Sequence, residues 1–345
     1  MTHRNAAYAI VLAAVAFQLT ACGQEEEVAR ITQETIAFRS GDLQMSGSLY
    51  LPEAEEPVPL LVLFHAASGG SSEYPFYGHL KKELPEAGIA TFVYDRRGTG
   101  NQPGNFTTAS FEYLAADGIA AATVLAKHPS IDPHRIGAWG ISQGGWVAPL
   151  AAAMSDEISF AIAVSGPGVT PARQMAFAAE YHLREAGYDE ETVELAMSLR
   201  ARVDAYYRNP DAAELVALQE TIDAHADAPW FPLAFLPRRG ELPADVTQSK
   251  WHQEMDFEPT EFLSTMRDPL LIIYGEQDRW VPVQESVDAI REALPDESSL
   301  AIYRSQSSGH LMSGQAEGMD YDGSLPVEDT YLVVMIDWIA SLRSQ

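Results

Sequence analysis

The sequence predicts an α/β fold: a mostly parallel sheet with helices on both faces and one helical insertion. Short apolar runs alternate with helical segments along most of the 345 residues, which is typical of parallel strands joined by helical crossovers. The alternation stops over residues 167–265, where the sequence has the periodicity of amphipathic helices. A chain of this length suits one large domain with such an insertion, or two domains.

The first part of the predicted core, residues 34–166, begins with two β-prone runs around a turn at residues 40–42. Continuous apolar runs then predict buried parallel strands, and the segments between them predict helices. The expected strands are residues 58–65, 88–95, 134–140 and 158–166, and the expected helices are residues 74–87, 107–129 and a segment that starts after Ser142.

The second part of the predicted core, residues 266–345, resumes the alternation after the insertion. An apolar run over residues 269–275 predicts a buried strand, and residues 299–305 predict another. Helical periodicity is expected over residues 283–294 and in a closing helix over residues 330–342.

The composition is that of a globular and strongly acidic protein. Hydrophobic residues make up 46% and charged residues 21%, and the formal net charge is -27. Such a surface repels nucleic acid, so no nucleic-acid partner is expected. The single cysteine, Cys22, excludes an intramolecular disulfide. Because no histidine spacing or glycine-rich loop matches a metal or phosphate motif, we expect neither a metal nor a cofactor.

The N-terminus has the pattern of an export signal. A basic start at Arg4 precedes an apolar run over residues 6–17, which is too short to span a bilayer as a helix. The run ends in the residues "LTAC", which resemble the lipobox of bacterial lipoproteins. The alternative is an ordinary secretory signal in which the cysteine is accidental.

The lipobox resemblance implies the fate of the N-terminus. Residues 1–21 would be removed, Cys22 would be acylated, and residues 22–33 would form a flexible tether. Lipid chains would then hold the exported protein on a membrane without a spanning helix. Since Gly23 and not aspartate follows the cysteine, the resemblance favours the outer membrane, with the protein facing the periplasm.

A serine at a predicted strand-to-helix junction is the candidate nucleophile. The stretch "IGAWGISQGGW" places Ser142 between Gly140 and Gly144, after an expected strand and before an expected helix. A nucleophile elbow needs this context, because small neighbours let strand and helix approach around a strained turn. The start of the helix also offers free N–H groups and the positive end of its dipole.

A serine hydroxyl needs a base, and the base needs an orienting acid. In elbow-type enzymes both follow the serine, each at the end of a later strand. His310 is the only histidine after Asp278, so it is the predicted base. Asp278 is the preferred acid, because the residues that follow it start the next helix, and Glu276 is the rival carboxylate.

Two backbone N–H groups are expected to form the oxyanion hole. One belongs to Gln143, the residue after the nucleophile. The second is expected from the loop "HAASGG" that follows the strand at residues 58–65, with Ala67 as the first choice and Ala66 as the second.

These motifs resemble those of the α/β-hydrolases. The resemblance rests on "HAASGG", "YDRRGTG", "IDPHRIGAWGISQGGWVAPLAA", "GEQD" and "SSGH", and it is closer to secreted or periplasmic serine esterases related to the prolyl-oligopeptidase and dienelactone-hydrolase branches. It implies Ser142 as nucleophile, Asp278 as acid and His310 as base, with Gln143 and Ala67 as oxyanion donors. The family often has glycine at the position of Ala66.

Two segments have alternative interpretations. Residues 95–97 are charged and either bind substrate or, as we prefer, form a turn that ties the sheet edge together. Residues 228–239 are rich in aromatic residues and proline. Within them, Trp230, Phe231 and Phe235 either line a substrate pocket or pack the insertion against the core.

The predicted reaction is the hydrolysis of a carboxylic ester through an acyl-enzyme. The insertion at residues 167–265 would form a helical cap over the site, which favours small to medium, mostly apolar esters. A serine peptidase or amidase uses the same three residues and is one alternative. A non-catalytic binding lipoprotein on the same scaffold is the other.

Overall fold

A computed structural model describes residues 30–313 and 327–342 of the chain. The predicted signal peptide and Cys22, the predicted site of acylation, lie outside these residues, as does most of the predicted tether.

The core is an eight-stranded sheet with the strand order β1-β2-β4-β3-β5-β6-β7-β8. The first two strands form an antiparallel hairpin, β2 pairs antiparallel with β4, and all remaining pairs are parallel. The predicted mostly parallel sheet is therefore confirmed. The strands are β1 (Ile31–Ser40), β2 (Leu43–Pro52), β3 (Val58–Phe64), β4 (Ala90–Tyr94), β5 (Ile131–Ile141), β6 (Phe160–Val164), β7 (Leu270–Gly275) and β8 (Leu300–Ser305).

Two strands begin earlier than the sequence predicts. β1 starts at Ile31 because its pairing with β2 continues to the pair Ile31 and Pro52. Its first three residues therefore belong to the sheet and not to the tether. β5 starts at Ile131, which pairs with Val58 on β3.

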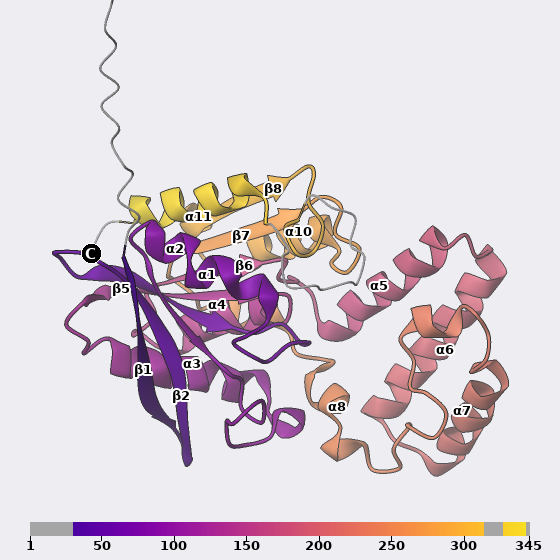
Figure 1. Cartoon of the computed structure of the whole chain (residues 1–345). Coiled ribbons are helices and arrows are strands. Elements are labelled where there is room, and N and C mark those ends of the chain that lie inside the picture. The colour runs from indigo at the N-terminus through magenta and orange to yellow at the C-terminus, as the bar shows by residue number, and fades with distance from the viewer. Residues whose placement is uncertain (1–29, 314–326, 343–345) are drawn as a thin grey trace, which may run out of the picture.

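Helices cover both faces of the sheet, as predicted (Figure 1). On one face lie α3 (Phe111–Leu125), α4 (Gly144–Met154) and α10 (Val283–Ala293), and on the other lie α1 (Gly78–Lys81), α2 (Glu83–Glu86) and α11 (Asp329–Ser341). The alternation along β3 shows the two cores, because Leu60 and Val62 join the first and Leu61 and Leu63 join the second.

The helix predicted over residues 74–87 is interrupted. It consists of η1 (Pro75–Tyr77), α1 and α2, with a break at Lys82. Pro85 explains the break, because it has no N–H to donate to the carbonyl of Lys81 and its ring crowds that carbonyl. Three further short helices, η2 (Phe106–Thr108), η4 (Val246–Gln248) and η5 (Glu297–Ser299), lie in connecting segments.

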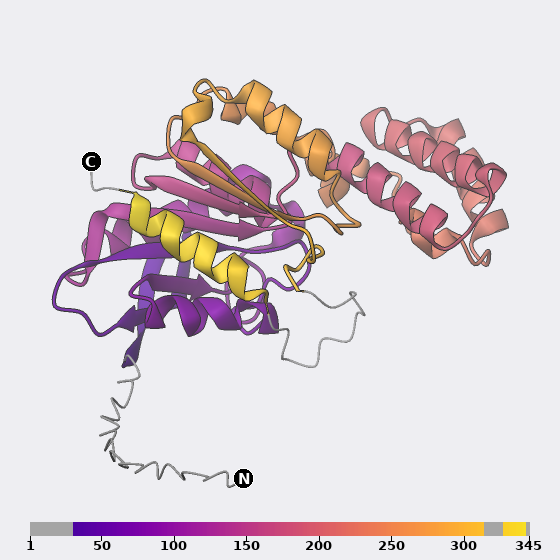
Figure 2. The same ribbon diagram turned by 90° about the horizontal axis from the view of Figure 1, so that it is seen from above.

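Residues 167–265 contain helices and no strand. These helices are α5 (Pro171–Glu185), α6 (Glu190–Arg208), α7 (Ala212–His225), η3 (Phe231–Ala234), η4, α8 (Lys250–Glu254) and α9 (Pro259–Leu263). Helices α5, α6 and α7 extend to one side of the sheet instead of covering a face (Figures 1 and 2). The insertion has a hydrophobic core of its own, to which α6 contributes Leu199 and Tyr206.

Candidate active site

Ser142 lies on a strained turn between β5 and α4. Its φ angle is 55°, in the left-handed region that non-glycine residues seldom occupy. Its N–H donates to the carbonyl of Val164 at 2.9 Å, and its carbonyl accepts from Gly145 N–H at 2.8 Å. The flanking glycines are required by close approach, because a Cβ at Gly140 would lie 1.9 Å from the carbonyl oxygen of Gly144. The predicted strand-turn-helix geometry is present.

Asp278 and His310 are brought together from the loops after β7 and β8. Nδ1 of His310 lies 2.8 Å from Oδ2 of Asp278. The other carboxylate oxygen of Asp278 accepts from the backbone N–H groups of Trp280 at 2.8 Å and Val281 at 3.0 Å. Both oxygens are thus held, and the imidazole is oriented with Nε2 as the nitrogen that accepts a proton. The rival, Glu276, instead accepts from Arg304 at 3.1 Å.

The end of β6 links the nucleophile to the histidine loop. Val164, its last residue, accepts from Ser142 N–H at 2.9 Å. The next residue, Ser165, is fully buried and donates its hydroxyl to the backbone carbonyl of His310 at 2.8 Å. Ser142, Asp278 and His310 therefore follow β5, β7 and β8 at one edge of the sheet. Sequence reasoning missed Ser165, although its place near the carboxyl end of the strand predicted over residues 158–166 was a usable signal.

The two predicted oxyanion donors are available. Among the described residues, neither the N–H of Gln143 nor that of Ala67 has a hydrogen-bond partner. The second choice, Ala66, donates to the hydroxyl of Tyr77 at 3.4 Å. Ala67 is also exposed, whereas Ala66 is buried. The geometry therefore favours Ala67 over Ala66.

The three charged residues after β4 have separate roles. Asp95 accepts from the N–H of Ser72 at 2.7 Å, and Arg97 forms an ion pair with Asp117 at 2.6 Å. These two contacts agree with the predicted charged turn. Arg96 differs, because its guanidinium donates to the loop that carries Ala67.

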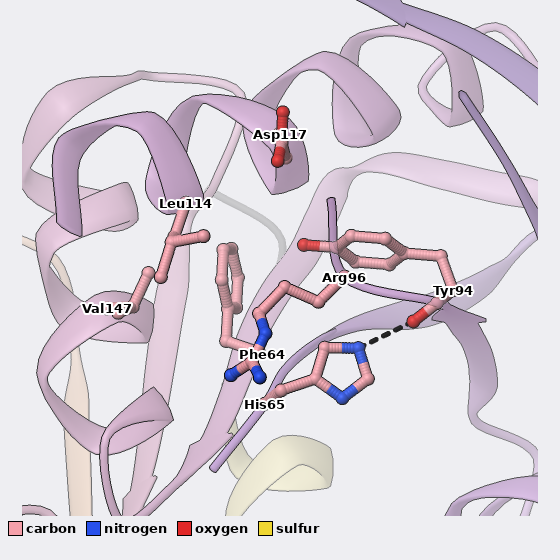
Figure 3. A pocket seen from close by; sticks show the side chains of 7 residues that line it. All are labelled: Phe64, His65, Tyr94, Arg96, Leu114, Asp117 and Val147. Carbon is pink, nitrogen blue, oxygen red and sulfur yellow. Dashed lines mark hydrogen bonds between the residues drawn. The ribbon is translucent and has the colours of Figure 1, made fainter. Parts of the chain in front are cut away.

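A small pocket lies behind this loop and is lined by Phe64, His65, Tyr94, Arg96, Leu114, Asp117 and Val147 (Figure 3). Nε2 of His65 donates to the carbonyl of Tyr94 at 2.5 Å, and Nδ1 lies 3.2 Å from the hydroxyl of Tyr77. Burial lowers the pKa of His65 to about 4, so the ring is neutral at pH 7. Its bonding shows a structural histidine and not a second base.

Aromatic residues lie near the ring of His310. The Trp280 ring is 6.4 Å from the His310 ring and 5.2 Å from the Phe235 ring. Trp230 and Phe231, in contrast, are buried in the insertion's own core. Of the three aromatic residues predicted for the pocket, Trp230 and Phe231 therefore pack within the insertion. Phe235 instead contacts Trp280, the ring next to His310.

Glu254 on α8 connects the insertion to the oxyanion side. Its Oε2 accepts from the side-chain amide of Gln143 at 3.4 Å, and its Oε1 pairs with Lys250. Burial raises the pKa of Glu254 to about 7, against the opposing effect of Lys250. Within residues 30–313 and 327–342, no cluster of three or more histidine, cysteine, aspartate or glutamate residues could hold a metal, and no helix is long and apolar enough to cross a membrane.

Comparisons with known proteins agree with the fold. A relative from Aspergillus aculeatus, described as thiohydrolase aneE, is 24% identical over 315 residues, which cover 83% of this chain and 89% of the relative. The solved proline iminopeptidase of Mycobacterium smegmatis superposes with a TM-score of 0.54 at 17% identity, over 89% of this chain and 98% of that one. Acetyl xylan esterase from Paenibacillus sp. R4 gives 0.54 at 16% identity, over 93% and 87%.

At such identities the two solved structures show the fold alone. The family comparison goes further, because the model of the family described as serine aminopeptidase, S33, matches residues 55–307. That match spans the elbow of Ser142, the loop of Asp278 and most of the sheet. The chain therefore belongs to the serine aminopeptidase S33 family, a family of serine hydrolases with the α/β-hydrolase fold.

Proposed function

We propose that this hydrolase cleaves carboxylic esters through an acyl-enzyme on Ser142. The observation that carries the proposal is the hydrogen bond between Nδ1 of His310 and the buried carboxylate of Asp278 at 2.8 Å, at the same sheet edge as the strained turn of Ser142. This arrangement supplies a base held in one tautomer and a nucleophile on an elbow at one edge of the sheet.

The reaction proceeds in two acyl transfers. Nε2 of His310 takes the proton from the hydroxyl of Ser142, whose oxygen attacks the ester carbonyl. The N–H groups of Gln143 and Ala67 stabilise the oxyanion. When the tetrahedral intermediate collapses, the ester C–O bond breaks and His310 gives its proton to the leaving alcohol. A water then loses a proton to His310 and attacks the acyl group, and Ser142 regains its proton as the acid leaves.

Apolar substrates are favoured on the histidine side of the site. Trp280 is a half-buried aromatic residue beside His310, and the half-buried Phe235 packs against Trp280. His310 must face the leaving group when it donates its proton. Phe235 has a φ angle of 49°, and its strained backbone is held by Arg200, which donates to its carbonyl at 3.2 Å. Strain kept in place by a buried partner is typical of functional positions. We therefore propose that the insertion caps the site and that Phe235 and Trp280 contact small to medium apolar esters.

A peptidase or amidase activity is the second candidate. It is favoured by the family match, whose description is a serine aminopeptidase. Esters and amides pass through the same intermediate, so the relative rates on a matched ester and amide decide between these activities.

Purified wild-type protein and Ser142→Ala test the proposal with a series of nitrophenyl esters, a thioester and an aminoacyl anilide. We expect the wild type to hydrolyse the esters fastest and to react with a fluorophosphonate probe, and Ser142→Ala to lose both reactions. Ser155→Ala, at the far end of α4, is the matched control and should keep them. Full ester hydrolysis by Ser142→Ala would contradict the proposed nucleophile, and absence of any hydrolysis or labelling in the wild type would favour a binding protein.

We also propose that the protein is exported and held by acylated Cys22 on the outer membrane, facing the periplasm. The lipobox-like residues 19–22 support this. Labelling of the full chain with radioactive palmitate in a bacterial host is expected for the wild type and not for Cys22→Ser. Equal labelling of both proteins, or of neither, would contradict the anchor.

A further inference from the structure

Arg96 is a buried cation without a carboxylate partner in the described part of the chain. It is 7% exposed, and no acidic group there lies within ion-pair distance of it. Burial lowers its pKa to about 10, which leaves the guanidinium charged at pH 7. A charge in such a place is costly unless other groups satisfy it. Its hydrogen bonds therefore show what the charge is used for.

The guanidinium of Arg96 holds the two carbonyl groups of the predicted oxyanion loop. Nη1 donates to the oxygen of Ala66 at 2.9 Å, and Nη2 donates to the oxygen of Ala67 at 3.2 Å. The carbonyl of Ala66 and the N–H of Ala67 belong to the same peptide group. Because a trans peptide is planar with its C=O and N–H pointing in opposite directions, a fixed Ala66 oxygen also fixes the direction of the Ala67 N–H.

The positive charge adds a second effect. A charged donor on the carbonyl oxygen is a strong hydrogen bond, and it polarises the whole peptide group. The N–H of Ala67 thereby becomes a stronger donor toward a negative oxygen. Both effects act where charge develops in the transition state of acyl transfer.

Arg96 is itself held by Phe106 and by the backbone of Gly70. Its guanidinium carbon lies 3.3 Å from the centre of the Phe106 ring, and its backbone N–H donates to the carbonyl of Gly70 at 2.7 Å. A Cβ at Gly70 would lie 2.7 Å from Nε of Arg96. Glycine at this position therefore leaves the space that the guanidinium occupies.

We propose that Arg96 is a positioning residue of the oxyanion hole, which fixes and polarises the N–H of Ala67. The inference rests on the proposed acyl transfer at Ser142 and adds a residue to it. The adjacent Arg97 offers a matched control, because it forms its bidentate ion pair with Asp117, at 2.7 and 2.6 Å, instead of contacting the loop.

The test compares Arg96→Met, Arg96→Lys, Gly70→Ala and Arg97→Met with the wild type. The readouts are kcat and KM on a nitrophenyl ester and the Ki of a trifluoromethyl ketone, which forms a tetrahedral oxyanion on the serine. Loss of one oxyanion donor typically lowers kcat by about 10²–10³-fold. We expect Arg96→Met to lose about that much in kcat with little change in KM, which is the result for an interaction made in the transition state.

The other variants separate positioning from folding. Arg96→Lys keeps the charge and should recover part of the loss, and Gly70→Ala should lower kcat because it displaces the guanidinium. Arg97→Met should lower the thermal midpoint and leave kcat nearly unchanged. Across the Arg96 and Gly70 variants, the affinity for the ketone should fall in proportion to kcat/KM.

Two results would overturn the inference: folded Arg96→Met with wild-type kcat, or a ketone affinity that does not follow kcat/KM. If Arg96→Met does not fold, Arg96→Lys and Gly70→Ala decide in the same way. Failure of the proposed function is distinguishable, because the wild type itself would then neither hydrolyse esters nor bind the ketone.

Discussion

The helical insertion meets the site on two flanks with opposite chemistry. The apolar flank consists of Phe235 of the insertion, whose ring lies 5.2 Å from that of Trp280 beside His310. The polar flank consists of Glu254 and Lys250 on α8, which lie near the oxyanion side of the site. Under the proposed function, the insertion thus supplies a surface for substrate beside His310 and a charged support near the proposed oxyanion donors.

The difference between the flanks has a physical consequence. Ring contacts tolerate changes of shape, since dispersion is spread over many atoms. Buried charges do not tolerate the loss of a partner, because the remaining group is left without compensation. Substitutions on the apolar flank are therefore expected to change which ester is preferred, and substitutions on the polar flank to change stability and its dependence on pH.

The largest effect is expected from substitution of Asp278, whose carboxylate orients His310 and which belongs to neither flank. Asp278→Asn should lower kcat by about 10³–10⁴-fold, because an amide does not hold the imidazole in the productive tautomer. The loss should be similar for aryl and alkyl esters, since both flanks use the same base. Steady-state kinetics on the two ester classes measure it. Glu276→Gln is the control, and a comparable loss in that variant would assign the acid to Glu276.

The apolar flank should show an intermediate effect, confined to substrate preference. Phe235→Ala and Trp280→Leu remove apolar contact worth about 1–3 kcal/mol. We expect the ratio of kcat/KM for an aryl ester to that for a methyl ester to fall by about ten- to a hundredfold. Phe231→Leu, a change in the core of the insertion, should lower the thermal midpoint and leave this ratio unchanged. An unchanged ratio in Phe235→Ala would show that the ring only packs the insertion.

The smallest effect is expected on the polar flank, from the titration of Glu254. Burial raises the pKa of Glu254 to about 7 from the usual 4.5, against the opposing charges of Lys250 and Arg96 and with a smaller contribution from Glu112. The folded state therefore holds a proton that the unfolded state releases between pH 4.5 and 7. The stability contributed by the protonated group is complete below pH 4.5 and is lost as the pH rises through 7.

Glu254→Gln cannot lose this proton. When the pH rises from 4.5 to 8, the unfolding free energy of the wild type should fall, relative to that of Glu254→Gln, by at most about 3 kcal/mol. Denaturant titrations across this range measure it. Burial lowers the pKa of both His65 and His79 to about 4, which destabilises both proteins alike in acid and cancels in the difference. The exposed Glu261→Gln is the control, and the same shift in that variant would contradict the assignment to Glu254.

Much of the fold and part of the site follow from local sequence patterns. Continuous apolar runs predicted the parallel strands, because a strand covered on both faces needs apolar residues at every position. Glycines around Ser142 predicted the turn, because strand and helix approach too closely there for a Cβ. The order of residues along the chain also singled out His310 and Asp278, which the structure brings to 2.8 Å.

Other features were not predictable in this way. The charged residues 95–97 look alike in the sequence, yet Arg97 faces Asp117 while Arg96 faces the loop of Ala66 and Ala67. Likewise, one aromatic segment divides between the core of the insertion, which contains Trp230 and Phe231, and the ring of Trp280, which Phe235 contacts.

The sequence by itself determined the strands, the helices, the elbow of Ser142 and the order of the candidate catalytic residues. These depend on periodicity and on backbone sterics, which act over a few neighbouring residues. Only the tertiary structure decided that Arg96 supports Ala67 and that Glu254 lies against Gln143, 111 positions away in the chain. Such contacts depend on how separate elements pack, because the direction of a side chain in space is set by its surroundings and not by its residue type.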